Sequence, residues 1–420
     1  MLYKNNKALY MFIMRTLAYS WISSAFLVSS LPACGRAAEL PSARQASAGK
    51  PDNAGIRFNS RKRSSGWVKF DLYSKSRIMF PVVVNGRTVT AMLDSGASST
   101  VLDKSFSEGL GLTTVDHLIG EAVGGKTDYS TVKGVSLQLG RMRWNGEAVA
   151  IDLSFVSQRV GRPLPILLGG ELFRKLVVDI DFARHRIAFR DPADFVAPAS
   201  AYSAPLTPAG DNQSITVSVE GRPANLVLDL GNPGNLILSP HFWARPGFMG
   251  TRKTSTGISG GAGGTREQRV TMVGLVTIGK SDFHEIPAQL WDVDSQVGTQ
   301  DPSSDGNIGI GILRRFHLIV DFPHHRVLLA PPIDHGTPFT IDHSGLRLKS
   351  SPAGKVVVYV AAASPAAKAG LIPGDVIASV NGVRQTLTTN DEWRFGPIPG
   401  RIKLHLLSGR DIVMELARYF

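Results

Sequence analysis

The chain has 420 residues, of which 43% are hydrophobic and 19% are charged, and it carries a formal net charge of +12. This composition is typical of a globular protein that is long enough for two or three domains. The basic residues are scattered, and no basic face with interleaved aromatic residues is visible, so nucleic-acid binding is not expected. Many glycine, proline and valine residues favour short strands and turns over helices.

The first 34 residues have the pattern of an export signal. Basic residues precede a mostly apolar run, Thr16–Leu31, which is too short and too rich in serine for a transmembrane helix. The run ends in LPACG, which resembles the lipobox of bacterial lipoproteins, whose cysteine is lipidated. The resemblance implies a protein of the bacterial cell envelope, periplasmic or anchored to the outer membrane through Cys34, the single cysteine. Cleavage after Gly35 or Ala37, which would yield a plainly secreted protein, is the alternative.

Four further segments follow the signal. Residues 35–75 are rich in small and basic residues without clear periodicity, and we predict a flexible tether there. Residues 76–197 and 198–333 are two similar segments, separated by a junction rich in proline. The remainder, 338–420, follows a second proline-rich boundary and has a different character.

The two middle segments are copies of one another. The sequence FPVVVNGRTVTAMLDSGASSTVL corresponds to ITVSVEGRPANLVLDLGNPGNLIL, and Asp94 is matched to Asp229 at an offset of 229 − 94 = 135 residues. Further along, Gly169 in an aliphatic run is matched to Gly309. Each copy is predicted to contain a hairpin, an Asp-x-Gly loop, a glycine-tipped hairpin, and then an aliphatic-Gly strand with a short helix. Pseudo-twofold symmetry would bring the two aspartates face to face.

Two such aspartates could activate a water molecule. Because like charges repel, a close pair of carboxyl groups holds a single proton at neutral or mildly acid pH. The ionised member can take a proton from water while the neutral member polarises a carbonyl oxygen, without a metal ion or another cofactor. Gly96 and Gly231 would allow a sharp loop whose backbone N–H groups reach the carboxylates.

The sequence around both aspartates resembles the retropepsin and pepsin family of aspartic proteases. Residues 93–98, LDSGAS, match the family's apolar-Asp-Thr/Ser-Gly motif, and ILLG and IG later in the two copies resemble its aliphatic-Gly motif. The resemblance implies a mostly β protein with two pseudo-twofold acid-protease lobes and one cleft for a peptide or protein substrate. Asp94 and Asp229 would be the catalytic dyad, supported by Ser95, Gly96 and Gly231. Hairpins near 120–130 and 257–268 would be flaps over the substrate.

The second motif departs from the family pattern. Leu230 follows Asp229 where the family has Thr or Ser, whose hydroxyl groups brace the two loops against each other. Ser95 can supply one such hydroxyl, but Leu230 cannot. Two hypotheses therefore stand side by side, an aspartic endopeptidase and a catalytically inactive, protease-like binding protein. A third, a serine hydrolase that uses Ser259 in the sequence GISGG, is disfavoured because a glycine run follows instead of a helix.

The C-terminal segment resembles a PDZ domain of the kind found in bacterial envelope proteases. The resemblance rests on residues 355–382, KVVVYVAAASPAAKAGLIPGDVIASVNG, in which SPA opens a predicted short helix and NG marks a hairpin turn. A small α/β PDZ domain would bind an extended peptide at a sheet edge, with backbone N–H groups holding a terminal carboxylate. The predicted carboxylate-binding loop comprises Ser344, Gly345, Leu346 and Arg347. An empty groove with a purely structural role is the alternative.

Overall fold

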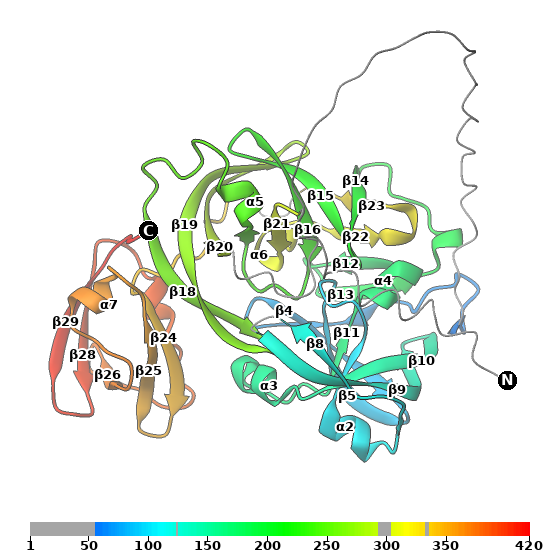
Figure 1. Ribbon diagram of the computed structural model, residues 1–420, viewed down its shortest axis with the longest axis horizontal. Helices are drawn as coiled ribbons and strands as arrows, with labels where there is room; N and C mark the ends of the chain where they lie inside the picture. Colours follow the sequence, from blue (N-terminus) through cyan, green and yellow to red (C-terminus); the bar gives the residue numbers. More distant parts are fainter. Residues whose placement is uncertain (1–54, 123–124, 293–303, 332–335) are drawn as a thin grey trace, which may run out of the picture. The chain divides into compact units, whose positions relative to one another are not determined.

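The computed structural model describes residues 55–122, 125–292, 304–331 and 336–420 (Figure 1). The predicted signal segment, including Cys34, lies outside the described residues. The predicted fold class is confirmed, since the chain is mostly β and contains two similar lobes and a small C-terminal module with its own sheet and a short helix. No helix in the described ranges is long and apolar enough to cross a bilayer.

The first lobe is built on one mixed sheet. Within the described residues its main strand order is β1-β10-β6-β11-β5-β4-β9-β7, with β3 paired to β4 and β8 paired to β9. Its strands are β1 (Ile56–Phe58), β3 (Asp71–Tyr73), β4 (Arg77–Val84), β5 (Arg87–Leu93), β6 (Val101–Asp103), β7 (Thr113–Thr114), β8 (Leu118–Ala122), β9 (Gly125–Leu139), β10 (Met142–Ile151) and β11 (Ile166–Leu168). Its helices are α2 (Lys104–Gly109), α3 (Ser154–Val160) and α4 (Gly170–Lys175).

The second lobe repeats this order of elements. Its strands are β15 (Asn212–Val219), β16 (Arg222–Asp229), β17 (Leu236–Leu238), β18 (Thr254–Gly261), β19 (Gly264–Ile278), β20 (Ser281–Leu290) and β21 (Gly306–Gly309), and its helices are α5 (Pro240–Trp243) and α6 (Ile310–Leu313). Strand β21 runs parallel to β16, as β11 runs parallel to β5 in the first lobe. The aliphatic-Gly strand of each copy therefore lies beside the strand that ends at the aspartate.

A shared run of strands joins the lobes. It comprises β2 (Val68–Lys69), β13 (Arg186–Arg190), β12 (Val177–Asp181), β22 (Leu318–Asp321), β23 (Arg326–Leu329) and β14 (Tyr202–Ala209), in that spatial order. Strands β12 and β22 are antiparallel, and Asp179 stands opposite Ile319 at the centre of their ladder. Each central strand is flanked by its own hairpin partner, so the pseudo-twofold axis passes between β12 and β22. Short 3-10 turns, η1 (Pro192–Asp194) and η2 (Phe322–His324), follow β13 and β22.

The duplicated hairpins end in turns of the same backbone shape. Asn85 and Gly86 have φ values of 45° and 83°, and Glu220 and Gly221 have φ values of 51° and 78°. Positive φ at both central residues is the mark of the tight type I′ turn that matches strand twist. The first side chain of each turn is also anchored to the next hairpin, because Asn85 accepts from the Ser136 N–H at 2.9 Å and Glu220 accepts from the Gly274 N–H at 2.7 Å. The NGR and EGR turns thus attach the first hairpin of each lobe to the next hairpin at equivalent positions.

One large hydrophobic cluster spans both lobes. It includes Phe80 and Leu93 from the first copy and Leu230 and Ile308 from the second, all buried. The C-terminal module has a separate core that contains Leu346 and residues of its five-stranded run. The two lobes are therefore one packing unit, whereas the C-terminal module has an independent core.

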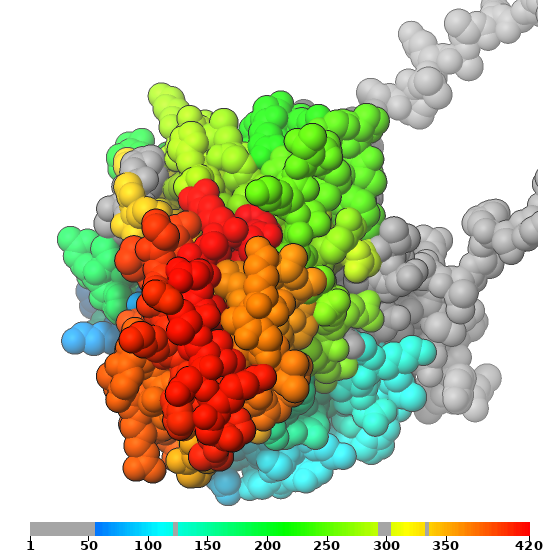
Figure 2. Space-filling model, turned by 90° about the vertical axis from the view of Figure 1, so that its left-hand side faces the viewer, coloured from blue at the N-terminus to red at the C-terminus, as the bar shows by residue number. Residues whose placement is uncertain are grey.

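The C-terminal module is a small sheet with one helix, and its surface is coloured orange to red in Figure 2. Its elements are β24 (Leu346–Ser351), β25 (Gly354–Val360), α7 (Pro365–Lys368), β26 (Val376–Val380), β27 (Val383–Arg384), η3 (Glu392–Phe395), β28 (Gly400–Leu406) and β29 (Asp411–Leu416). The described strand order is β24-β25-β26-β28-β29, with β27 beside β26. Ser364 caps α7 by accepting the Ala367 N–H at 3.2 Å, as the SPA sequence predicts.

Part of the predicted tether is folded. Strands β1, β2 and β3 lie within residues 35–75, where composition alone predicted a flexible segment. They pair with β10, β13 and β4, and the Ser65 N–H donates to the Phe189 carbonyl at 2.8 Å. The prediction was wrong for this part because these strands are only two or three residues long, and such short segments show no periodicity of their own.

Candidate active site

The two aspartates occupy equivalent loops at the ends of equivalent strands. Asp94 follows β5, and its Oδ1 accepts the N–H groups of Gly96 at 2.9 Å and Ala97 at 3.1 Å. Asp229 ends β16, and its Oδ1 accepts the N–H groups of Gly231 and Asn232, each at 2.9 Å. The backbone of each loop therefore wraps around one carboxylate oxygen and orients it.

The glycines of the loops allow the two carboxylates to approach each other. A Cβ atom added to Gly96 would lie 2.6 Å from Oδ1 of Asp229, and one added to Gly231 would overlap the Asp94 carboxylate. Neither glycine has a positive φ, so the requirement for glycine is close approach and not backbone conformation. The predicted pairing of the lobes thus places each aspartate against the loop of the other copy.

Burial raises the pKa of both carboxyl groups, and the nearby charge of Asp94 raises the pKa of Asp229 further. The backbone N–H groups at each Oδ1 oppose this shift, because they stabilise the ionised form. Both residues are partly accessible at the surface. A pair of this kind holds one proton over a wide pH range, while a water molecule or a peptide bond can still reach it.

Ser95 of the first loop holds the two aspartate loops together through its hydroxyl group. Its hydroxyl donates to the Leu228 carbonyl at 2.8 Å and accepts the Leu230 N–H at 2.9 Å, so it spans from the first copy to the second. Leu230, at the equivalent position, is 0% exposed and packs in the hydrophobic core. Residue 230 therefore supplies no hydroxyl, and its side chain contributes apolar packing instead.

The side chain of Asn307, on β21, also contacts the dyad, and the sequence analysis did not predict this contact. Nδ2 of Asn307 donates to Oδ2 of Asp229 at 2.9 Å, and Oδ1 of Asn307 accepts from Nδ2 of Asn232 at 2.7 Å. The counterpart of Asn307 in the first copy is Leu167, since each lies two residues before the matched glycine. The signal in the sequence was an amide in an otherwise aliphatic run.

Arg77 was also missed, although its position follows from the strand register. Met79 pairs with Met92 across β4 and β5, and continuing this antiparallel register by two residues places Arg77 opposite Asp94. The guanidinium is largely buried, its Nε makes no hydrogen bond within the described residues, and its NH1 donates to the Ser76 carbonyl at 3.3 Å. Its positive charge lowers the pKa of both Asp94 and Asp229, and burial lowers the pKa of Arg77 itself.

The predicted flaps are present as two hairpins. Strands β8 and β9 form the first and β18 and β19 form the second, although residues 123–124 lie outside the described ranges. The hairpins meet near their tips, since a Cβ on Gly125 would lie 3.0 Å from the Gly263 carbonyl oxygen. Ser259 lies within β18 opposite Arg266, so the strand–turn–helix setting of a nucleophilic serine is absent at this residue.

The second flap is also hydrogen-bonded to the C-terminal module. The Tyr359 hydroxyl on β25 contacts Oε2 of Glu267 at 2.8 Å, and the Ala362 N–H donates to Oγ1 of Thr256 at 3.1 Å. Glu267 and Thr256 belong to β19 and β18, the two strands of the hairpin. Polar side chains of this hairpin therefore contact both β25 and the segment between β25 and α7.

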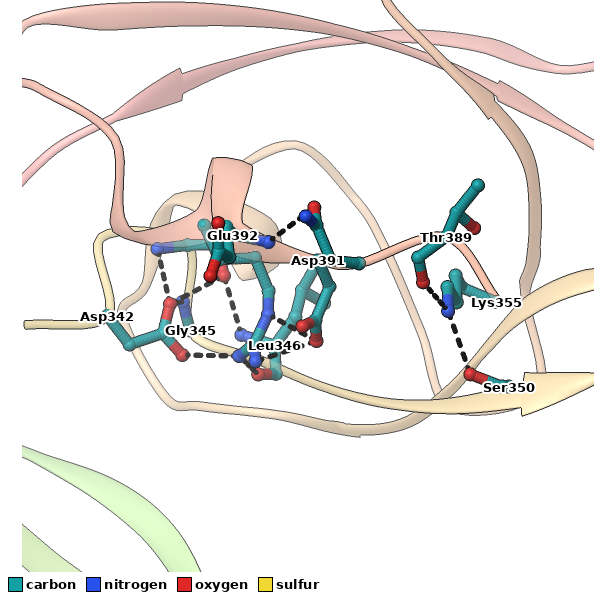
Figure 3. Close-up of polar contacts among 11 residues, drawn as sticks. Asp342, Gly345, Leu346, Ser350, Lys355, Thr389, Asp391 and Glu392 are labelled. Atoms are coloured by element: carbon teal, nitrogen blue, oxygen red, sulfur yellow. Dashed lines mark hydrogen bonds and ion pairs between the residues drawn. The ribbon is translucent and has the colours of Figure 1, made fainter. Parts of the chain in front are cut away.

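The predicted carboxylate-binding loop of the C-terminal module is occupied by the chain itself (Figure 3). Oδ1 of Asp342 accepts the N–H groups of Ser344 at 2.8 Å and Gly345 at 3.2 Å, and the Leu346 N–H donates to the Ser344 hydroxyl at 3.1 Å. Arg394, 5% exposed, donates to Oδ2 of Asp342 at 3.1 Å and to the Leu346 carbonyl at 2.6 Å. The carboxylate-binding role of this loop stays a prediction, and it would require Asp342 to move.

Comparisons with known families agree with the geometry of the lobes and of the C-terminal module. Residues 80–172 and 215–312 match the family model of the aspartyl protease, one segment in each lobe. Residues 356–395 match the PDZ domain. No curated protein matches the chain.

Proposed function

Because the chain is a tandem-lobed member of the aspartyl protease family with a C-terminal PDZ domain, we propose that it is an aspartic endopeptidase. The single observation that carries the proposal is the pair of matched loops, in which the glycine of each copy lies against the carboxylate of the other. Asp94 and Asp229 are the proposed catalytic residues. The flap hairpins β8–β9 and β18–β19 would cover an extended peptide.

The proposed reaction is hydrolysis of a peptide bond by an activated water molecule. The ionised carboxylate of the dyad takes one proton from the water as its oxygen attacks the carbonyl carbon, and the protonated carboxyl gives its proton to the carbonyl oxygen. Collapse of the resulting diol breaks the C–N bond, and the first carboxylate passes its new proton to the leaving nitrogen. A hydroxyl proton of the diol returns to the second carboxylate, which restores the starting state.

The test is cleavage of an unfolded protein by the wild type and by Asp94→Asn and Asp229→Asn, each checked for folding by circular dichroism. Loss of either carboxylate removes general acid–base catalysis, and we expect kcat/KM to fall about 10²–10⁴-fold. Full activity of Asp229→Asn would show that the dyad is not the catalyst.

A second candidate function rests on Leu230. The missing hydroxyl favours a protease-like protein that binds peptides without cutting them. This reading predicts that the wild type cleaves nothing, while peptide binding persists unchanged in both Asn variants. Binding of a labelled peptide, measured by fluorescence anisotropy on the same three proteins, separates the two functions.

The PDZ domain supports peptide binding in general, and we propose that it binds internal segments. Strand β24 lies at an edge of the described sheet, where a peptide can add as a further strand, whereas Asp342 holds the N–H groups of the terminal-carboxylate loop. Peptides with a free and with an amidated C-terminus should therefore bind the full-length protein equally. At least tenfold tighter binding of the free acid would contradict this proposal.

We further propose that the protein is exported to the bacterial envelope and anchored through a lipid on Cys34. Support comes from the apolar segment and the LPACG sequence alone. In a bacterial host, Cys34→Ser should move the protein from the membrane fraction to the soluble periplasmic fraction. An unchanged membrane fraction would overturn the lipid anchor.

A further inference from the structure

Asn232, Asn307 and Asp229 form a hydrogen-bonded relay whose direction is fixed by the backbone. The Gly234 N–H, which can only donate, donates to Oδ1 of Asn232 at 2.8 Å. Nδ2 of Asn232 therefore faces Asn307 and donates to its Oδ1 at 2.7 Å. This leaves Nδ2 of Asn307 to donate to Oδ2 of Asp229 at 2.9 Å.

The relay makes Asp229 an acceptor at both of its oxygens. Oδ1 accepts two backbone N–H groups, and Oδ2 accepts the amide of Asn307. Three donors aimed at one carboxyl group favour its ionised form. Asn307 is 2% exposed, so its amide is held in place, and both of its polar atoms are satisfied.

Asp94 has no equivalent of this third donor within the described residues. Its Oδ1 accepts two backbone N–H groups, as Oδ1 of Asp229 does. Leu167, the counterpart of Asn307, carries no donor, and Ala97 stands where Asn232 stands in the second copy. Both members of the relay are therefore absent from the first copy, and the dyad is electrostatically unequal.

The other charged groups acting on the dyad do not produce this inequality. Arg77, from β4, favours the ionised form of both aspartates. The charge of Asp94 raises the pKa of Asp229, but repulsion between two carboxylates acts on both members of a pair and does not by itself decide which of them holds the proton. The amide of Asn307 is the group that distinguishes one carboxyl from the other.

We propose that Asn307 is a positioning residue that keeps Asp229 ionised and leaves the shared proton on Asp94. In the hydrolysis proposed above, on which this inference rests, Asp229 is then the base that takes the proton from water. Asp94 is the acid that protonates the carbonyl oxygen. The water proton on Asp229 later passes to the leaving nitrogen, and Asp94 regains a proton from the diol.

The test replaces Asn307 by the residue of the first copy, Asn307→Leu, which removes the donor and keeps a side chain of similar size. The acid limb of the profile of kcat/KM against pH should move upward by about one pH unit, since a hydrogen bond to a charged group is lost. Asn235→Ala, which removes an amide from the same loop without touching the dyad, should leave the limb in place. An unmoved limb in a folded Asn307→Leu protein would overturn the proposal.

A second measurement does not depend on activity. The full-length protein is labelled with ¹³C at the aspartate carboxyl carbons, and the dyad signals are assigned from Asp94→Asn and Asp229→Asn. We expect the proton on Asp94 in the wild type and a shift of protonation towards Asp229 in Asn307→Leu. The proton on Asp229 in the wild type would contradict the assignment, even if the protein cleaves nothing and the proposed function fails.

Asn232→Ala supplies a further check if Asn307→Leu does not fold. It breaks the relay one step earlier and frees Asn307 to rotate. The acid limb and the carboxyl signals should then move in the same direction by a smaller amount. No change in either would also overturn the proposal.

Discussion

The two aspartate loops share a backbone and differ in what surrounds it. In each loop two N–H groups hold Oδ1, and a glycine faces the opposite carboxylate. The first loop adds the Ser95 hydroxyl, which spans the lobes, whereas the second adds a buried Leu230 and the amide of Asn307. The comparison shows that the backbone N–H groups and the glycines set the shape of both loops. The contact that holds the two loops together and the groups that place the shared proton come from side chains that differ between the two copies.

The largest expected effect tests what the loops have in common. In Gly231→Ala the new Cβ would overlap the Asp94 carboxylate, so the two carboxyl groups must separate. Misplacing catalytic groups by about 1 Å can cost about 10²-fold in rate, and we expect kcat/KM to fall at least that far. Gly336→Ala is the matched control, because no atom of the described residues lies within 4 Å of a Cβ added there. Wild-type activity in Gly231→Ala would mean that the loops do not approach as described.

Leu230→Ala tests the apolar side of the comparison. Leu230 is fully buried, so its truncation should lower the free energy of unfolding by about 2–5 kcal/mol. Because the Leu230 N–H still bonds to Ser95, kcat/KM of the folded fraction should change little. Urea denaturation and initial rates at low temperature measure the two quantities. A large loss of rate with unchanged stability would reverse the roles assigned to packing and brace.

Ser95→Ala tests the polar side. The change leaves the Leu228 carbonyl and the Leu230 N–H buried without their cross-lobe partner, at a cost of about 1–3 kcal/mol. Here kcat/KM should fall together with stability, because the brace holds both aspartate loops. Ser95→Thr keeps the hydroxyl and should stay near the wild type in both measurements. Ser95→Ala with normal activity would show that Leu230 packing alone positions the dyad.

The next prediction concerns stability and pH. Burial raises the pKa of the dyad carboxyl groups in the folded state above the unfolded value, which is about 3.9 for Asp. The stability that the protonated dyad contributes is therefore fully present below about pH 4 and is lost as pH rises through the folded pKa, by about 1.4 kcal/mol per unit of pKa elevation. In Asp94→Asn the free energy of unfolding should fall less steeply as pH rises. The urea denaturation midpoints of the wild type and of the variant should therefore diverge between pH 4 and pH 8. Parallel curves would mean that the dyad is not desolvated.

The smallest expected effect is that of a charge shared by both loops. Arg77→Met removes a positive charge that favours the ionised form of both aspartates, so the acid limb of kcat/KM should move to higher pH. The shift should be smaller than that in Asn307→Leu, because Asn307 donates a hydrogen bond to Asp229, whereas Arg77 acts through its charge without a hydrogen bond to either carboxylate within the described residues. Arg77→Lys keeps the charge and should restore the limb. A shift to lower pH would show that Arg77 acts otherwise than through its charge.

The fold could be predicted from the sequence because its signals are local and occur twice. A few residues suffice to indicate the backbone conformation at each of these signals, which are the NGR and EGR turns, the Asp-x-Gly loops and the SPA start of a helix. Asn307 and Arg77 could not be found in this way, since their contacts depend on the register between strands distant in sequence. Strands β1 to β3 were missed because segments of two or three residues show no periodicity. The Asp342 contacts also escaped notice, although an Asp two residues before a Ser-Gly pair is a recognisable turn signal.

The single Ser95 brace has a consequence for how such a site can diversify. In an assembly of two identical lobes every substitution occurs at both loops, so a pair of second lobes would have leucine at both positions and no hydroxyl between them. Fusion of the copies into one chain lets a serine in one lobe serve both loops. The other loop is then free to acquire Leu230, Asn232 and Asn307 together. The covalent link between the lobes is thus what makes an unequal pair of aspartates possible.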